Sequence, residues 1–231
     1  MLPRPPLGVG PAPRSPSGRA GASSSARRLH LIVMVKEPRP GRVKTRLARD
    51  IGSVEAVWWF RRQTRSLLRR LDDPRWRIAL AVAPDREGLS SRVWPPGIPK
   101  IPQGSGDLGA RMARLLTGLR PCPALLVGSD VPDLQASHIA RAMRLLDRND
   151  AVFGPSPDGG YWLVGLRNLR PAPPGFFKGV RWSSEHALSD SLATLPGLRI
   201  GFADTLSDVD TVADLRRARS FENDGDKPRQ T

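Results

Sequence analysis

The stretch LHLIVMVKEPRPGRVKTRLA, residues 29–48, decides how this chain folds. It opens on an apolar run, which predicts a buried β-strand. Pro38 and Gly41 then interrupt regular structure, and residues 36–48 carry five cations against the single acid Glu37. Because like charges at this density repel one another, the pattern predicts a phosphate-binding loop that leads into a helix. A solvated basic loop is the alternative. The five cations are Lys36, Arg39, Arg42, Lys44 and Arg46.

Beyond this stretch, apolar runs alternate with helical patterns along the chain. Further strands are predicted at residues 77–83, 98–101, 124–128, 151–154, 161–166 and 198–203. Helices are predicted at residues 53–72, 107–119, 136–146, 183–195 and 211–219, with Ser53 as the first N-cap. Apolar strands that alternate with amphipathic helices indicate an α/β fold. We expect a single domain with a mostly parallel central sheet and helices on both faces.

The two ends of the chain differ in composition from the middle. Residues 1–28 are rich in Pro, Gly, Ser and Arg and hold few large apolar side chains, so they cannot offset the entropy of ordering. We expect a disordered basic tail there. An organellar transit peptide, or a start codon assigned too far upstream, would have the same composition. Residues 222–231 predict a second, polar tail. The folded domain is therefore expected to span residues 29–221.

Charge and cysteine content limit the classes of function. The net charge of +15 invites a nucleic-acid partner, but 32 of the 37 basic residues are arginine, as GC-rich coding alone would produce. Nucleic-acid binding is therefore not the expected main function. No apolar run approaches the roughly 20 residues of a membrane span. The single cysteine, Cys122, cannot form an internal disulfide, which favours a reducing, cytoplasmic compartment.

Acidic side chains gather after the predicted strands, where ligands bind in open α/β sheets. Asp130 follows the run at 124–128, Asp158 follows 151–154, and Asp208 and Asp210 follow 198–203. Such carboxylates can hold Mg²⁺ or Mn²⁺, which prefer oxygen ligands and allow acids to stand near an anionic substrate. The sequence thus predicts a metal beside the basic loop.

Most of these acids also have a local interpretation. Asp133, and either Asp208 or Asp210, could each cap a helix, as Asp107 could. Asp158 precedes two glycines, a pattern that favours an Asx-turn. Asp130 is harder to explain locally, because a carboxylate after a buried strand is costly unless a cation meets it.

Five motifs now converge on a known family. The motifs are LIVMVKEPRPGRVKTRLARDIG, GSGDLGARM, LLVGSDVPDL, AVFGPSPDGGYWLVGL and SDVDTVADL, and they run in order between Leu29 and Phe221. Together they resemble the bacterial glycosyltransferase-like proteins of arsenosugar biosynthesis, also described as radical-SAM/selenodomain-associated transferases. The resemblance implies the nucleotide-diphospho-sugar transferase superfamily and its GT-A, Rossmann-like fold. It also implies a likeness to guanylyltransferases that act on small phosphorylated substrates.

The resemblance implies a role for each matching residue. Nucleotide phosphates would bind Lys36, Gly41, Lys44 and Arg46. A metal would bind Asp130, Asp208 and Asp210, with Asp130 and Asp158 as the catalytic residues and Asp158 as a base. The sugar or acceptor would meet Asp107, Gly159, Gly160 and Tyr161. The motif SDVPD departs from the D-x-D pattern of many GT-A enzymes, because its acids stand three apart.

Three functions remain open on the sequence alone. The first is metal-dependent transfer of a sugar from a nucleotide sugar to a small-molecule acceptor. The second is transfer of a nucleotidyl group from an NTP with release of pyrophosphate. The third is a non-catalytic nucleotide- or nucleic-acid-binding domain, which would have no use for Asp130. The absence of a G-G-x-[SG]-x-R-M turn after the first strand favours sugar transfer. The sequence indicates no oligomeric state.

Overall fold

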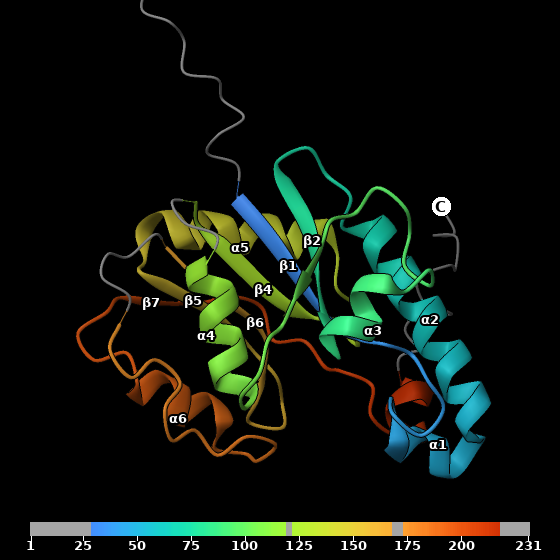
Figure 1. Cartoon of the computed structure of the whole chain (residues 1–231). Helices are drawn as coiled ribbons and strands as arrows, with labels where there is room; N and C mark the ends of the chain where they lie inside the picture. Colours follow the sequence, from blue (N-terminus) through green and yellow to red (C-terminus); the bar gives the residue numbers. More distant parts are fainter. Residues whose placement is uncertain (1–28, 119–121, 168–172, 218–231) are drawn as a thin grey trace, which may run out of the picture.

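Strand β1 (Leu29–Lys36) lies inside the central sheet of the computed structural model, which describes residues 29–118, 122–167 and 173–217. Seven strands of the described chain form this sheet in the order β3-β2-β1-β4-β6-β5-β7 (Figure 1). The other strands are β2 (Trp76–Ala83), β3 (Lys100–Pro102), β4 (Ala124–Gly128), β5 (Ala151–Pro155), β6 (Tyr161–Leu166) and β7 (Ile200–Phe202). The tails predicted at 1–28 and 222–231 lie outside the described residues.

All described strands run in one direction except β6, which is antiparallel to both of its neighbours, β4 and β5. The reversal follows from the short turn between β5 and β6, because a tight connection can join only antiparallel strands. The mostly parallel sheet predicted from the sequence is therefore confirmed. The carboxyl ends of β1, β4, β5 and β7 consequently share one edge of the sheet with the start of β6.

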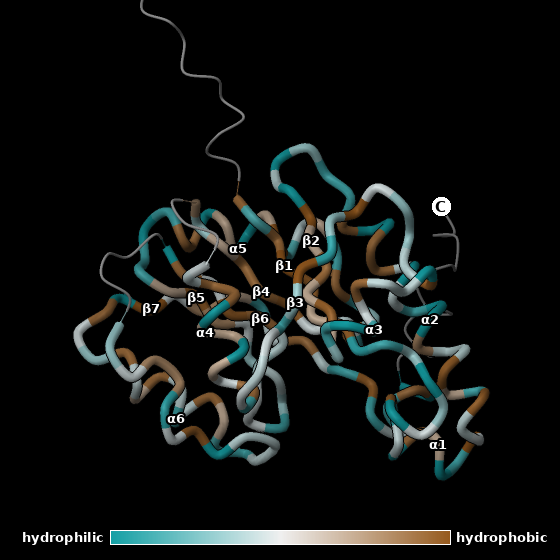
Figure 2. Tube along the Cα trace, viewed as in Figure 1, coloured by the Kyte–Doolittle hydropathy of each residue, from teal (hydrophilic) through white to brown (hydrophobic). Residues whose placement is uncertain are grey.

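Helices cover both faces of the sheet, as predicted. Alternate residues of β1 point to opposite faces: Leu31 and Val33 join a core with α2 and α5, whereas Ile32 joins a core with α4 and α6. Figure 1 shows α4 in front of the sheet and α5 behind it. Figure 2 shows the hydrophobic residues concentrated in the strands between these layers. The helices are α1 (Thr45–Ile51), α2 (Ser53–Arg70), α3 (Asp85–Ser90), α4 (Leu108–Gly118), α5 (Ala136–Arg148) and α6 (Ala187–Ala193).

Several local predictions need correction. The short helices α1 and α3 were not predicted, because neither is long enough to show a periodic apolar stripe. Gly52 (φ 91°), not Ser53, is the N-cap of α2, because Ser53 is already the first residue of the helix. Trp58, within the predicted helix 53–72, is 63% exposed, and Arg61 lies over its ring. No helix in the described ranges has the length and apolar character to cross a membrane.

The segment after β7 crosses the lower end of the sheet and reaches α1 (Figure 1). The backbone N–H of Val209 donates to the carbonyl of Asp130 at 3.0 Å, which ties this segment to the end of β4. Val209 and Leu215 also pack against Leu47 of α1 and Ala56 of α2. The crossing brings Asp208 and Asp210 next to the basic loop.

Candidate functional site

A cleft of about 660 Å³ opens at the carboxyl edge of the sheet. Its walls come from the end of β1, the basic loop, the end of β4, the start of β6, α4 and the loop before α6. The predicted site residues that line it are Lys36, Lys44, Arg46, Asp130, Tyr161 and Asp210. A second groove of about 640 Å³, between α5 and β7, contains no predicted site residue. The first cleft is therefore the candidate site.

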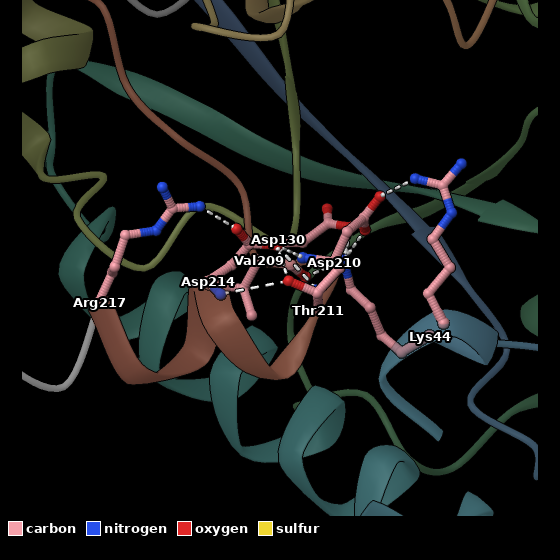
Figure 3. Close-up of polar contacts among 8 residues, drawn as sticks. Lys44, Asp130, Val209, Asp210, Thr211, Asp214 and Arg217 are labelled. Carbon is pink, nitrogen blue, oxygen red and sulfur yellow. Dashed lines mark hydrogen bonds and ion pairs between the residues drawn. The ribbon is translucent and has the colours of Figure 1, made fainter. Parts of the chain in front are cut away.

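Lys44 is the centre of this site. Its Nζ lies 2.5 Å from Asp130 Oδ2 and 2.8 Å from Asp210 Oδ1, and it donates to the carbonyl of Val209 at 2.6 Å. Figure 3 shows these groups converging from the basic loop, the end of β4 and the segment after β7. The cation that the position of Asp130 demands is therefore Lys44, supplied from 86 positions earlier in the chain.

The environment of Lys44 fixes its charge and its position. The side chain is 4% exposed, and its Nζ lies 5.9 Å from the centre of the Trp59 ring. The backbone adopts the left-handed conformation (φ 48°), which is strained for a residue with a Cβ. Burial alone would lower the pKa of Lys44, but Asp130 and Asp210 outweigh burial and raise it. Lys44 is thus a charged ammonium inside the protein at neutral pH.

The other loop cations divide into two groups. Arg39 and Arg42 pair with Glu87 of α3, at 3.5 and 3.0 Å. Arg46 is 66% exposed and reaches Asp210 only at 3.5 Å. Lys36 is exposed at the end of β1 and makes no ion pair with another described residue. Lys36 makes no ion pair within the described chain, Arg46 makes only a long one, and both line the cleft, so these two cations are the best placed to meet an incoming anion.

Negative charge remains in excess around Lys44. Burial, followed by the nearby charges of Asp210 and Asp130, raises the pKa of Asp208 to about 6. Asp158 adds a smaller effect of the same sign, and the attraction of Lys44 does not cancel the sum. Asp130 and Asp210 thus share one buried cation, and Asp208 lies close enough for both to raise its pKa, so negative charge exceeds positive charge here.

Asp210 is positioned by the start of the final helix, which is described over residues 212–217. The Asp214 carboxylate accepts hydrogen bonds from the backbone N–H of Thr211 at 2.8 Å and of Asp210 at 3.1 Å. The Thr211 hydroxyl accepts from the Asp214 N–H at 3.3 Å, which completes a capping box. The prediction that Asp208 or Asp210 caps this helix is wrong, because Thr211 does so.

This box predicts a pH-dependent contribution to stability. Burial alone would raise the pKa of Asp214, but hydrogen bonds from Thr211 and Arg217 outweigh it and lower the pKa from 3.8 to about 2. The depressed pKa means that Asp214 stabilises the fold at neutral pH and stops doing so as the pH falls from 3.8 toward 2. We expect Asp214→Ala to lower the free energy of unfolding by about 1 kcal/mol at neutral pH.

Urea denaturation of wild type and variant at pH 7 and at about pH 3 measures this effect. Asp147→Ala is the matched control, because Asp147 is an exposed helical acid for which the structure gives no hydrogen bond or ion pair. The deficit of Asp214→Ala should shrink in acid while the control stays near zero. A deficit of equal size at both pH values would rule out this contribution.

Other predicted residues lie outside the lining of the cleft. Asp107 accepts a hydrogen bond from the Ala110 N–H at 2.8 Å and so caps α4, its local interpretation. Asp158 is exposed and accepts from the Gly160 N–H at 3.0 Å, which forms the Asx-turn that its sequence favours. The backbone of Glu185 lies against Gly159 so closely that no Cβ would fit. Gly41 provides a left-handed turn (φ 76°) in open space.

The structure also brings to the cleft residues that the sequence did not single out. Gln103 is 2% exposed and donates to the carbonyls of Val35 and Ala81 at 3.1 and 2.8 Å. Its Oε1 accepts from Arg111 at 3.1 Å, so the guanidinium of Arg111 is held at the cleft wall. Trp182, on the loop before α6, lies against Gly109 of α4 and also lines the cleft. A glutamine directly after the short strand β3 was the available signal for this side of the site.

The fit of a metal can be tested on these contacts. Among the described residues, no three His, Cys, Asp or Glu side chains come together as ligands. The oxygens of Asp130, Asp210 and Val209 do converge on one point, and oxygen is the donor that Mg²⁺ and Mn²⁺ require. That point holds the ammonium of Lys44. These oxygens are therefore the type of ligand that a divalent cation needs. The predicted metal-binding triad of Asp130, Asp208 and Asp210 does not form among the described residues.

Comparison with known proteins identifies the family. A family model described as "Uncharacterized protein conserved in bacteria (DUF2064)" matches residues 67–184, about half of the chain. The chain belongs to this family. No curated protein matches this DUF2064 chain significantly.

Solved structures share the fold of this DUF2064 protein. The crystal structure of a candidate nucleotide-diphospho-sugar transferase from Desulfovibrio desulfuricans G20 is 27% identical, with a TM-score of 0.78 over 89% of this chain and 92% of that one. A 4-diphosphocytidyl-2C-methyl-D-erythritol synthase from Anaerococcus prevotii DSM 20548 is 11% identical, with a TM-score of 0.55 over 86% and 99% of the chains. The inositol-1-phosphate CTP transferase from T. maritima is 14% identical, with a TM-score of 0.52 over 88% and 99%.

The last two structures show the fold alone. The first, together with the family match, supports the nucleotide-diphospho-sugar transferase superfamily that the motifs indicate. The likeness to the Desulfovibrio protein therefore supports a nucleotide-using transferase as the general kind of protein.

Proposed function

We propose that this protein is a metal-dependent glycosyltransferase that moves a sugar from a nucleotide-diphospho-sugar to a small-molecule acceptor. The observation that carries the proposal is the meeting of Lys44, Asp130 and Asp210 at the strand-end cleft. A site that pairs cations with carboxylates suits a metal-bound diphosphate, because the cations meet phosphate oxygens and the carboxylates meet the metal. The likeness to the Desulfovibrio protein supports a nucleotide sugar as the donor.

In this reaction the chain's own residues bind and orient the diphosphate. The exposed Lys36 and Arg46 meet its oxygens as the bond to the sugar breaks, and preorganised charges of this kind stabilise a developing anion. Asp130 and Asp210 would hold Mg²⁺ or Mn²⁺. When bound, such an ion neutralises charge on the leaving diphosphate as a Lewis acid.

The acceptor is proposed to bind on the opposite wall of the cleft. Leu108 and Met112 of α4, together with Tyr161 and Trp182, give this wall an apolar and aromatic surface that suits the face of a ring. The resemblance to transferases of arsenosugar biosynthesis points to a small-molecule acceptor. The exposed Asp158 is the proposed base, because only one of its carboxylate oxygens accepts a hydrogen bond within the described chain.

Nucleotidyl transfer is the second candidate, and one observation favours it. Asp158 does not line the cleft, and both acids that do are paired with Lys44. A phosphate nucleophile needs no base, so a substrate phosphate that attacks an NTP could react in such a site by positioning alone. The released product, pyrophosphate instead of a nucleoside diphosphate, separates the two reactions.

The single cysteine, Cys122, is buried, which agrees with the cytoplasmic location that we propose. A non-catalytic binding domain is the least favoured alternative, because it leaves the carboxylate cluster without a purpose.

Metal-dependent binding of a nucleoside diphosphate tests the proposal. We expect UDP, GDP, CDP or ADP at millimolar concentration to raise the melting temperature of the full chain with Mg²⁺ present, because ligands that bind only the native state stabilise it. Without Mg²⁺ the shift should be smaller. Inorganic phosphate at the same concentration is the control for simple anion binding. Equal shifts with phosphate and with every nucleotide, or no shift at all, would refute a nucleotide site.

A further inference from the structure

The ammonium of Lys44 occupies the point at which the oxygens of the site converge. Asp130 Oδ2, Asp210 Oδ1 and the Val209 carbonyl all lie within 2.8 Å of its Nζ (Figure 3). Mg²⁺ binds oxygen at about 2.0–2.1 Å. A divalent cation therefore cannot use these three oxygens while the ammonium lies among them.

Lys44 also differs from the other cations of the loop. It is 4% exposed, whereas Arg46 is 66% exposed and Lys36 has no ion pair with the described residues. A loop that served only to attract phosphate would leave all of its cations in solvent. The burial of Lys44 against two carboxylates shows that its charge is used within the protein when no ligand is bound.

We propose that Lys44 is the resident cation of the carboxylate cluster and that a divalent metal replaces it only when a nucleotide binds. The inference rests on the proposed function, because the phosphates of the nucleotide are the new partner for the displaced ammonium. Metal and nucleotide then bind cooperatively, and each binds weakly without the other. The exchange is electrostatically balanced, since the metal neutralises Asp130 and Asp210 while Lys44 neutralises phosphate.

Removal of the ammonium tests this exchange without any turnover. We expect Lys44→Met to bind Mn²⁺ at least about tenfold more tightly than wild type in the absence of nucleotide. Electron paramagnetic resonance of free Mn²⁺, titrated with the full-length protein, measures the affinity. Methionine keeps the length of the side chain and packs against Trp59, and circular dichroism checks the fold of the variant.

Arg46→Met is the matched control. It removes one positive charge near the same carboxylate, but Arg46 is exposed and only 3.5 Å from Asp210 Oδ2. We expect less than about a threefold change in Mn²⁺ affinity, because exposed charges are screened. Equal gains in both variants would overturn the proposal, since they would reflect net charge alone. No gain in Lys44→Met would overturn it as well.

Wild-type protein provides a second test that needs no variant. We expect saturating nucleoside diphosphate to tighten Mn²⁺ binding about tenfold, and Mn²⁺ to tighten nucleotide binding by the same factor. In Lys44→Met, the factor by which each ligand tightens binding of the other should fall toward one. Nucleotide binding that is independent of Mn²⁺ would overturn the exchange and leave the nucleotide site intact. Tighter Mn²⁺ binding by Lys44→Met without any nucleotide binding would uphold the competition and refute the proposed function.

Discussion

Asp130→Asn is expected to lower kcat for sugar transfer by about 10²–10³-fold, the usual effect of removing one preorganised charge from a transition-state site. The substitution keeps the shape of the side chain and removes the negative charge that faces Lys44 at 2.5 Å. The backbone carbonyl of Asp130, which accepts from Val209, is unaffected. The fold and the crossing segment should therefore survive while the metal loses a ligand.

Asp133→Asn is the matched control for this prediction. Asp133 lies in the same loop, is exposed and makes no contact with Lys44; the N-cap of α5 is Gln135, not Asp133 as the sequence suggested. We expect the control to retain wild-type turnover. Steady-state rates for the two variants and wild type give the comparison. Near-normal turnover by Asp130→Asn would place the chemistry away from the end of β4 and would favour a non-catalytic binding domain.

The second large effect concerns the product, where we expect nucleoside diphosphate to form and pyrophosphate to be undetectable. Both reactions expel an anion that Lys36 and Arg46 can bind, so the cations do not separate them. The acceptor wall favours sugar transfer, because Tyr161, Trp182 and Met112 are uncharged and suit the apolar face of a ring. Arg111 is the one described cation on that side, and Gln103 holds it.

Arg111 gives this prediction a specific test. If the acceptor attacks through a phosphate, Arg111→Met should raise its KM about tenfold or more, the loss expected for one charge-assisted hydrogen bond. If the acceptor attacks through a hydroxyl, the same change should alter KM by less than about threefold. The proposed sugar transfer predicts the smaller change.

The sequence predicted the architecture well because its signals were local. Apolar runs located the strands of the sheet, and the strand-end rule predicted that Lys44, Asp130 and Asp210 would share an edge, which their distances confirm. The Asx-turn at Asp158 and the cap at Asp107 were also local alternatives, and both form. Short-range chemistry of this kind depends on neighbouring residues and needs no tertiary information.

What the sequence could not give is the partner of each charge. Counting charges along the basic loop suggested strong repulsion, but Glu87 meets Arg42 and Arg39 from α3, a helix that was not predicted. Asp130 and Asp210 likewise meet Lys44 from far along the chain. Tertiary contacts therefore pair Arg39 and Arg42 with Glu87, bury Lys44 between two carboxylates, and leave Lys36 and Arg46 at the cleft.

Product analysis with a panel of donors tests the central claim most directly. Full-length protein is incubated with Mg²⁺ and with UDP-, GDP-, ADP- and CDP-sugars or the four NTPs, and nucleoside diphosphate and pyrophosphate are separated by ion-exchange chromatography. Asp130→Asn serves as the blank. We predict that at least one nucleotide sugar yields its nucleoside diphosphate in wild type and not in the blank. Pyrophosphate from an NTP, with no turnover of any nucleotide sugar, would contradict the assignment as a glycosyltransferase.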